Sequence, residues 1–251
     1  MVLDIQIISI EGNIGSGKST LLSNLKKYYN DEDTVIFLKE PVDEWSKIKD
    51  EDGVTMLEKF YSNQTKYAFS FQMMAYISRL KLLKDTVDEI KNKHSSFIKK
   101  NINNNSVQEP DEKLKLSKYF IITERSLYTD KMVFAQMLYD SSKIEHINFQ
   151  IYLNWFNTFA EEYPVHKIIY VKTDPEICYQ RVGTRNREGE DNIPLEYLKS
   201  CHKYHENMLD TSSSNCLCKN QIILNGNHNI YINQEILDKW IDSIQKFIFY
   251  N

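Results

Sequence analysis

The stretch that decides the fold is residues 5–19, IQIISIEGNIGSGKS. Its first part, Ile5 to Ile10, is rich in β-branched residues and predicts a buried strand. The part from Gly12 has the spacing G-x-x-x-x-G-K-S, and residues 17–29 then predict a helix. A strand, a glycine-rich turn and a helix in this order are typical of a phosphate-binding loop. A plain strand-to-helix turn is the alternative, but it needs neither the lysine nor three glycines.

Backbone N–H groups of such a loop converge on phosphate oxygens at the N-terminus of the helix. Lys18 would reach the outer phosphates, and Ser19 would ligate Mg²⁺. A switch GTPase is disfavoured because the chain has no N-K-x-D sequence. Asp174 is better explained as a helix N-cap than as a metal-binding acid. We expect a nucleoside triphosphate to contact Gly12, Asn13, Ile14, Gly15, Ser16, Gly17, Lys18, Ser19 and Thr20.

Four more apolar or aromatic runs predict strands, at residues 34–38, 119–123, 167–171 and 221–224. Helices are expected over residues 54–93, 126–139, 144–162, 174–181, 194–209 and 234–249. The alternation predicts an α/β fold with a five-stranded parallel sheet flanked by helices. Residues 91–118 show little periodicity, and we interpret them as a mobile surface insertion in a single domain spanning residues 1–251. A linker between two domains is the alternative.

The composition is that of a globular protein, with 251 residues, 41% of them apolar. The net charge of −4 gives no general attraction for nucleic acid. Four cysteines are too few for a disulfide framework, and their spacing does not match a closed zinc site. No apolar run approaches the roughly 20 residues of a membrane-spanning helix, and the first residues lack a signal-peptide pattern. We expect an intracellular, cytoplasmic protein that binds neither nucleic acid nor membrane.

Carboxylates follow the second and third predicted strands. Glu40 begins the sequence EPVDEW, and Glu124 begins the sequence ERS. Ligands of open parallel sheets bind at the carboxyl ends of the strands, so both acids are expected beside the glycine-rich loop. The arginines are also informative, because only five of the 31 basic residues are arginine and an arginine offers a planar, bidentate fork. They are Arg79, Arg125, Arg181, Arg185 and Arg187.

Taken together, these motifs resemble the deoxyribonucleoside kinases of the deoxycytidine and deoxyguanosine kinase type. The resemblance runs from Gly12 to about Phe249. It rests on five motifs in order: the loop at 12–19, Glu40-Pro41-Val42 with Trp45, Ser70-Phe71-Gln72, Glu124-Arg125-Ser126, and residues 185–198.

The resemblance implies transfer of the γ-phosphoryl group of ATP, or of another nucleoside triphosphate, to the 5′-hydroxyl of a deoxynucleoside in nucleotide salvage. Glu40 would be the general base, oriented by Arg125. Glu124 and Ser19 would hold Mg²⁺. The remaining catalytic cations would be Lys18 and the two arginines of a lid over the phosphates, Arg185 and Arg187.

A nucleoside pocket is implied as well. Gln72 would pair with the base, and Arg79 follows it on the same helix face. Asp130 would accept from Arg79, and family members with this charged pair favour deoxycytidine and deoxypurines over thymidine. An ordinary salt bridge is the alternative for the pair. Further expected contacts are Ile14, Trp45, Phe71 and Phe134 around the base, Tyr61 and either Glu190 or Glu188 at the sugar, and Asn225, Gly226 and Asn227 at the donor base.

A homodimer is a further implication, formed through the predicted helices that begin at Ser126 and Ile144. The main alternative function is a nucleoside monophosphate kinase of the thymidylate kinase kind, in which Arg79 would bind the acceptor phosphate. The second is a nucleotide-dependent binding protein without turnover, which the position of Glu40 disfavours.

Overall fold

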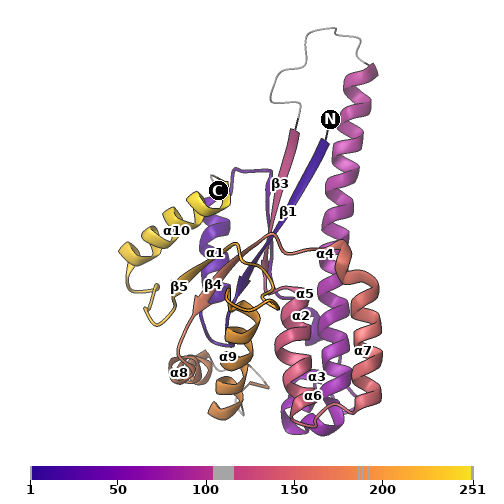
Figure 1. The fold of residues 1–251 in the computed structure, drawn as a ribbon, viewed down its shortest axis with the longest axis vertical. Coiled ribbons are helices and arrows are strands. Elements are labelled where there is room, and N and C mark those ends of the chain that lie inside the picture. The colour runs from indigo at the N-terminus through magenta and orange to yellow at the C-terminus, as the bar shows by residue number, and fades with distance from the viewer. Residues whose placement is uncertain (1, 104–115, 186, 188, 191–192, 250–251) are drawn as a thin grey trace.

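Five parallel strands form one sheet with the order β2-β3-β1-β4-β5 (Figure 1). The computed structural model describes residues 2–103, 116–185, 187, 189–190 and 193–249. The strands are β1 (Val2–Glu11), β2 (Val35–Leu38), β3 (Leu116–Glu124), β4 (Lys167–Lys172) and β5 (Gln221–Asn225). The predicted fold class and all five predicted strands are confirmed.

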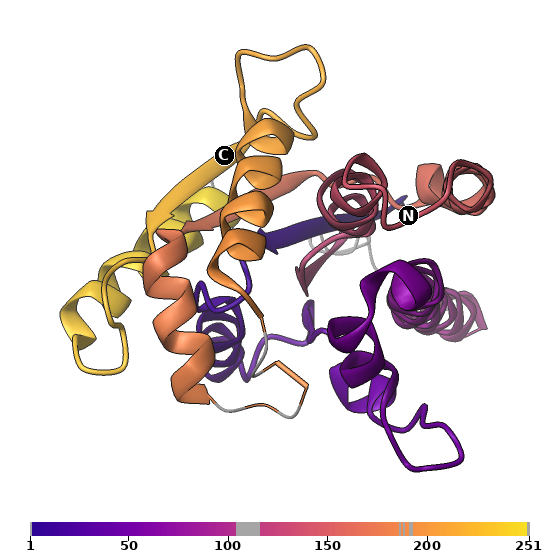
Figure 2. The same ribbon diagram turned by 90° about the horizontal axis from the view of Figure 1, so that it is seen from below.

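Helices cover both faces of the sheet, because successive strand residues point to opposite sides. On β3, Ile121 packs into a core with Phe60 and Tyr76, whereas Ile122 packs into a second core with Leu21. Helices α3 to α7 pack into the first core, and α9 packs beside them against η2, whereas α1 and α10 pack into the second core. In Figure 2, α3 to α7 gather on the right of the view and α8 to α10 on the left. The helices are α1 (Lys18–Tyr28), α2 (Val42–Trp45), α3 (Met56–Ser62), α4 (Gln64–Asn103), α5 (Leu127–Thr129), the π-helix η2 (Asp130–Ala135), α6 (Gln136–Asp140), α7 (His146–Phe159), the 3₁₀-helix η3 (Ala160–Glu162), α8 (Pro175–Arg185), α9 (Leu195–Leu209) and α10 (Gln234–Phe249).

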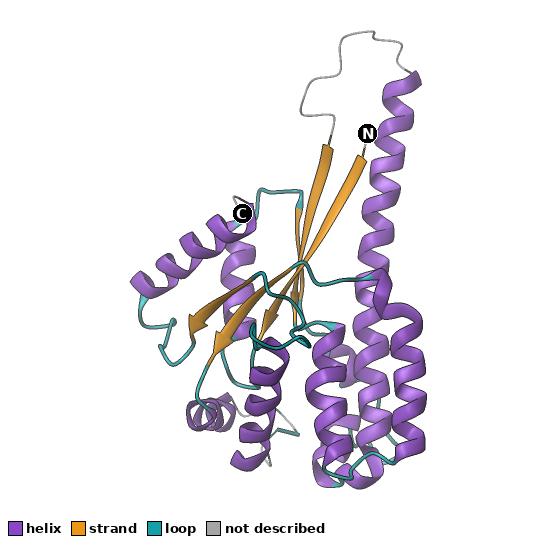
Figure 3. Cartoon of the chain, viewed as in Figure 1, coloured by secondary structure: helices purple, strands orange, loops and turns teal. Residues whose placement is uncertain are grey.

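The strand register brings the ends of three strands to one edge. Ile10 of β1 pairs with Glu124 of β3, and Leu38 of β2 pairs with Thr123 of β3. The loops that follow β1, β2 and β3 therefore leave the sheet side by side. At the opposite end, β1 and β3 extend beyond the other strands (Figure 3).

The segment expected to be a surface insertion, residues 91–118, has regular secondary structure at both of its ends. Residues 91–103 continue α4, which is 40 residues long, and β3 already begins at Leu116. Residues 104–115 lie outside the described part of the chain. Buried Val87, Ile90 and His94 recur at helical spacing along α4, and this pattern carries the helix into the lysine-rich stretch.

Two of the predicted helices are interrupted in the structure. The helix expected over residues 54–93 becomes α3 and α4, because Asn63 leaves helical geometry between them. A capping box of Thr55 and Glu58 sets the start of α3. The helix expected over residues 126–139 contains the π-helix η2 in its middle.

Among the described residues, no helix combines the length and apolar character needed to cross a membrane.

A buried histidine fixes the packing of α9 against η2. His205 is fully buried, its Nδ1 lies 2.8 Å from the carbonyl oxygen of Cys201, and its ring meets Phe134 edge-on. Burial lowers the pKa of His205 to about 3, although the hydrogen bond to Cys201 opposes the shift. The folded protein therefore holds this imidazole neutral, with Nδ1 as the donor.

This shift predicts acid-sensitive stability. Below its ordinary pKa of about 6.5, His205 takes up a proton only in the unfolded chain, so unfolding becomes easier as the pH falls towards 3. Between pH 6.5 and 5.5 we expect His205 to lower the free energy of unfolding by about 1 kcal/mol. Urea unfolding at several pH values should show this loss in the wild type and not in His205→Gln. Equal pH slopes in the two proteins would contradict it.

Candidate active site

A cavity of about 460 Å³ opens at the carboxyl edge of the sheet, and the loop between β1 and α1 forms one wall. Gly12 has φ +143°, and a Cβ there would lie 2.6 Å from the carbonyl oxygen of Val171. At Gly15, with φ +78°, a Cβ would lie 2.6 Å from the carbonyl oxygen of Cys178. Only glycine fits at these two positions, so the loop lies tightly against β4 and α8 with the N-terminus of α1 facing the cavity.

Lys18 is buried at the centre of this loop. Its ammonium group donates to the carbonyl oxygen of Asn13 at 2.5 Å. Burial and the positive charge of Arg125 lower the pKa of Lys18 to about 7, although Glu124 and Glu40 oppose the shift. A bound polyphosphate would place negative charge beside Lys18 and so favour its protonated form.

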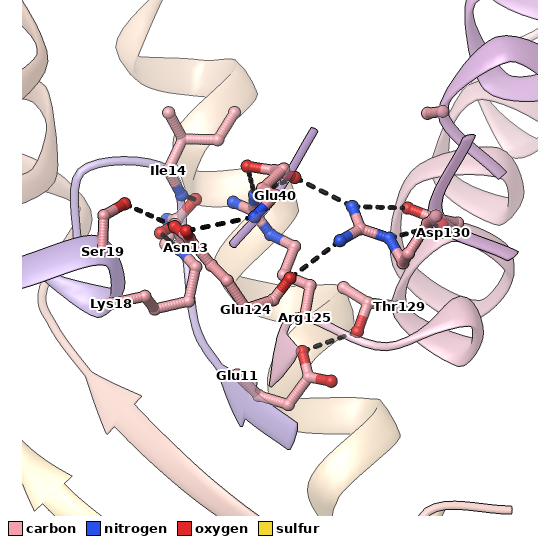
Figure 4. Close-up of polar contacts among 12 residues, drawn as sticks. Glu11, Asn13, Ile14, Lys18, Ser19, Glu40, Glu124, Arg125, Thr129 and Asp130 are labelled. Atoms are coloured by element: carbon pink, nitrogen blue, oxygen red, sulfur yellow. Dashed lines mark hydrogen bonds and ion pairs between the residues drawn. The ribbon is translucent and has the colours of Figure 1, made fainter. Parts of the chain in front are cut away.

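Four charged side chains from four different segments meet beside the loop (Figure 4). The carboxylate of Glu40, after β2, accepts from Arg125 Nη1 at 2.7 and 2.8 Å and from Arg79 Nη2 at 2.9 Å. Arg79 Nε also donates to Asp130 at 2.9 Å, and its Nη1 donates to the carbonyl oxygen of Glu124 at 2.7 Å. All four side chains are at most 12% exposed. Their charges balance, as burial of ionised groups requires.

This balance sets the protonation of Glu40. Burial would raise its pKa, but the guanidinium groups of Arg125 and Arg79 outweigh burial and hold the pKa well below its ordinary value. Glu40 is therefore an ionised acceptor at neutral pH. For Asp130, burial raises the pKa, although Arg79 opposes the shift.

Glu124 and Ser19 could hold a metal ion. The hydroxyl of Ser19 donates to the carboxylate of Glu124, which also accepts from the backbone N–H of Glu40 at 3.4 Å. Hydroxyl and carboxylate oxygens are ligands that Mg²⁺ prefers, and Mg²⁺ commonly takes its remaining ligands from phosphates and water. The described residues hold no cluster of three or more histidine, cysteine, aspartate or glutamate side chains that could bind a metal without such help.

The far end of the cavity is shaped for a flat, polar-edged group. Trp45 is fixed by a hydrogen bond of 2.8 Å from its indole N–H to Ser78, and it meets Phe71 edge-on. Gln72 is buried here, and its side-chain oxygen has no partner among the described residues. Phe134 lies 5.2 Å below the guanidinium of Arg125. The structure thus places the predicted Ile14, Trp45, Tyr61, Phe71, Gln72, Asp130 and Phe134 along one cavity.

Known proteins resemble this chain over most of its length. The family model for deoxynucleoside kinases covers residues 8–249. The chain belongs to the deoxynucleoside kinase family. The predicted family and its phosphotransferase class are thereby confirmed.

Curated members of the family align with most of the chain. Deoxycytidine kinase 2 of Gallus gallus is 32% identical over 218 residues, which are 80% of this chain and 73% of that protein. Deoxycytidine kinase of Homo sapiens is 31% identical over 222 residues, or 82% of this chain and 75% of that protein. Mitochondrial thymidine kinase 2 of Homo sapiens is 27% identical over 240 residues, or 95% of this chain and 77% of that protein. Relatives named for deoxycytidine and for thymidine thus have similar sequence identities to this chain.

In this member of the deoxynucleoside kinase family, the expected lid arginines pair with an acid. Arg185 and Arg187 both contact the buried carboxylate of Glu190, the latter at 3.1 Å. Glu190 borders the cavity near Tyr61, whose pKa is raised by burial and by the charge of Glu190. Glu188 lies outside the described residues.

Arg181 connects the loop to the segment after β5. Its guanidinium donates to the carbonyl oxygen of Gly226 at 2.8 Å and to that of His228 at 3.1 Å. Gly226 borders the cavity, whereas Asn227 exchanges hydrogen bonds with Asp174, just before α8. Asn225 approaches His228 at 3.4 Å.

Several cavity residues were not anticipated from the sequence: Val42, Leu57, Tyr197, Asn229, Ile230, Tyr231 and Trp240. Residues 228–231 directly follow the segment predicted for the donor base, so chain proximity was the available signal. Tyr231 even bonds to Thr20 of the loop at 2.5 Å. Trp240 lies on α10, and only the folded arrangement brings it to the cavity.

Proposed function

We propose that this protein transfers the γ-phosphoryl group of ATP, or of another nucleoside triphosphate, to the 5′-hydroxyl of a deoxynucleoside. One observation carries the proposal. The carboxylate of Glu40 lies in the same cavity as Lys18 and is held there by Arg125 and Arg79. A hydroxyl placed between Glu40 and a triphosphate on the loop would have a proton acceptor on one side and an electrophile on the other.

Each side chain then has a role in the reaction. Glu40 binds the 5′-hydroxyl and accepts its proton, while Arg125 orients that carboxylate. Arg125 also borders the cavity, so its positive charge would offset the negative charge that develops on the transferred group. Lys18 and the loop N–H groups bind the phosphates. Mg²⁺, held by Ser19 and Glu124, would neutralise phosphate charge.

The lid belongs to the same proposal. With phosphates bound, Arg185 and Arg187 would exchange part of their pairing with Glu190 for phosphate oxygens. Glu190 and Tyr61 would then be available to the sugar 3′-hydroxyl. Residues 225–231 would face the donor base across Arg181.

The acceptor is proposed to be deoxycytidine, deoxyadenosine or deoxyguanosine, which implies a role in nucleotide salvage. Gln72 offers an amide to the base edge, and Asp130 offers an acceptor for an exocyclic amino group. A nucleoside monophosphate kinase is disfavoured, because Arg79 already donates to Asp130, Glu40 and the carbonyl of Glu124 and so has no free edge for an acceptor phosphate.

A direct assay tests the proposed reaction. The purified protein is incubated with labelled ATP, Mg²⁺ and either single deoxynucleosides or single deoxynucleoside monophosphates. We expect labelled monophosphate from deoxynucleosides and no labelled diphosphate. Product only from monophosphates would establish the alternative kinase, and the absence of any product would favour a binding protein without turnover.

Glu40→Gln tests the general base. The amide keeps the shape and a hydrogen-bonding oxygen but cannot take the proton. We expect turnover to fall about 10²- to 10⁴-fold while the deoxynucleoside still binds, as measured by steady-state kinetics and calorimetry. Unchanged turnover would remove Glu40 from the mechanism.

The charged pair in the base pocket predicts substrate choice. Arg79→Met together with Asp130→Ala removes both charges, so neither is left buried and unpaired. Thymine carries an oxygen and a methyl group where cytosine has its amino edge, and we expect relative use of thymidine over deoxycytidine to rise at least about tenfold. Because the two substrates are compared within one variant, a general loss of activity cancels. Constant relative kcat/KM values would show that the pair is merely structural.

A homodimer is also proposed, with α7 in the interface. Its outer face exposes Ile147, Ile151 and Trp155, at 64%, 41% and 48%. Adjacent exposed apolar side chains of this size are typical of an association surface. Sedimentation velocity should give twice the chain mass, and Ile151→Asp should shift it towards the monomer. A wild-type monomer at micromolar concentration would contradict the proposal.

A further inference from the structure

Glu11 is a fully buried acid that the proposed reaction does not use. It is the last residue of β1 and directly precedes the glycine-rich loop. Its carboxylate accepts three hydroxyl hydrogen bonds, from Ser9 at 2.6 Å, Ser126 at 2.8 Å and Thr129 at 2.6 Å. No ion pair joins Glu11 to a lysine, arginine or histidine in the described parts of the chain. Three charge-assisted hydrogen bonds therefore replace its hydration.

Two of these hydroxyls also cap the short helix α5. The backbone N–H of Thr129 donates to the hydroxyl of Ser126 at 3.2 Å, and the N–H of Ser126 donates to the hydroxyl of Thr129 at 3.4 Å. A hydroxyl has one proton. Because each hydroxyl gives that proton to Glu11, only lone pairs face the two N–H groups. An acceptor-only side chain at position 11 thus orients both caps.

The capped turn is strained and carries site residues at both ends. Arg125 has φ +62°, a left-handed conformation that costs about 1 kcal/mol or more for a residue with a side chain. Its backbone N–H donates to the carbonyl of Ile10 at 3.0 Å. At the other end, Thr129 is followed by Asp130. Movement of this turn would displace the partners of both Glu40 and Arg79.

We propose that Glu11 is a positioning residue for the acceptor side of the site: through Ser126 and Thr129 it holds the 125–130 turn so that Arg125 meets Glu40 and Asp130 meets Arg79. Figure 4 shows Glu11 and Thr129 below this charged cluster. The inference rests on the proposed function, because positioning is defined relative to acceptor binding and transfer. On the donor side, Lys18 donates to the carbonyl oxygen of Asn13, a contact within the loop that does not involve Glu11, Ser126 or Thr129.

Three variants test the anchor. Glu11→Gln keeps the shape but presents N–H donors to a hydroxyl, which must then turn its own proton towards a capping N–H. Thr129→Val removes one anchored hydroxyl at nearly constant volume. Thr123→Val is the matched control: Thr123 is also a buried threonine, on β3, but its hydroxyl bonds only the carbonyl of Ile8, at 3.5 Å.

Kinetics with deoxycytidine and ATP give the functional readout. For Glu11→Gln and Thr129→Val we expect kcat/KM for deoxycytidine to fall about 10- to 100-fold, with KM for ATP within about twofold of the wild type. The control should keep both parameters. A merely structural role would reduce the active fraction and leave both KM values unchanged. That pattern, or equal losses in all three variants, would overturn the inference.

Hydrogen exchange separates this inference from the proposed function. Backbone N–H groups of residues 125–130 should exchange faster in Glu11→Gln than in Thr123→Val, while those of α1 do not. If the wild type phosphorylates no nucleoside, the proposed function fails, and the anchor is still tested by exchange. If the wild type is active but exchange at 125–130 is unaltered by Glu11→Gln, the anchor fails alone.

Discussion

Two guanidinium groups around one buried carboxylate are the interaction on which the site depends. Glu40, Arg125, Arg79 and Asp130 form a neutral set of four charges, almost completely removed from water. Removal of one partner from such a buried set typically costs about 3–5 kcal/mol, because an uncompensated charge remains. The two guanidinium groups keep Glu40 ionised, and their hydrogen bonds fix the direction of its oxygens. The electrostatics that stabilise the cluster thus also keep Glu40 deprotonated at neutral pH.

The fold assembles this cluster by strand register. Parallel β1, β2 and β3 end at one edge, and each contributes a functional segment immediately after its last paired residue. Arg79 reaches the edge from α4, and Asp130 reaches it from η2. π-helical turns are rare, and they occur often at functional sites. Here the wide turn begins at Asp130 and includes Phe134, which lies under Arg125.

The sequence was most informative where a single local pattern determines structure. Runs of buried β-branched residues predict the five strands. The glycine spacing predicts the loop, in which Gly12 and Gly15 lack room for a Cβ. The sequence was less informative where contacts between residues far apart along the chain determine the structure. Lysines and asparagines after residue 90 suggested a loop, but α4 continues to Asn103. The contacts of Glu11 were not anticipated from the sequence, because Ser126 and Thr129 are more than 100 residues away along the chain.

A crystal structure with a non-hydrolysable triphosphate, Mg²⁺ and deoxycytidine is the most direct test of the central claim. The expected complex has a Glu40 oxygen within about 3 Å of the 5′-hydroxyl and that hydroxyl in line with the γ-phosphorus above the loop. A complex in which Glu40 points away from the sugar, or in which another group contacts the 5′-hydroxyl, would contradict the proposed chemistry.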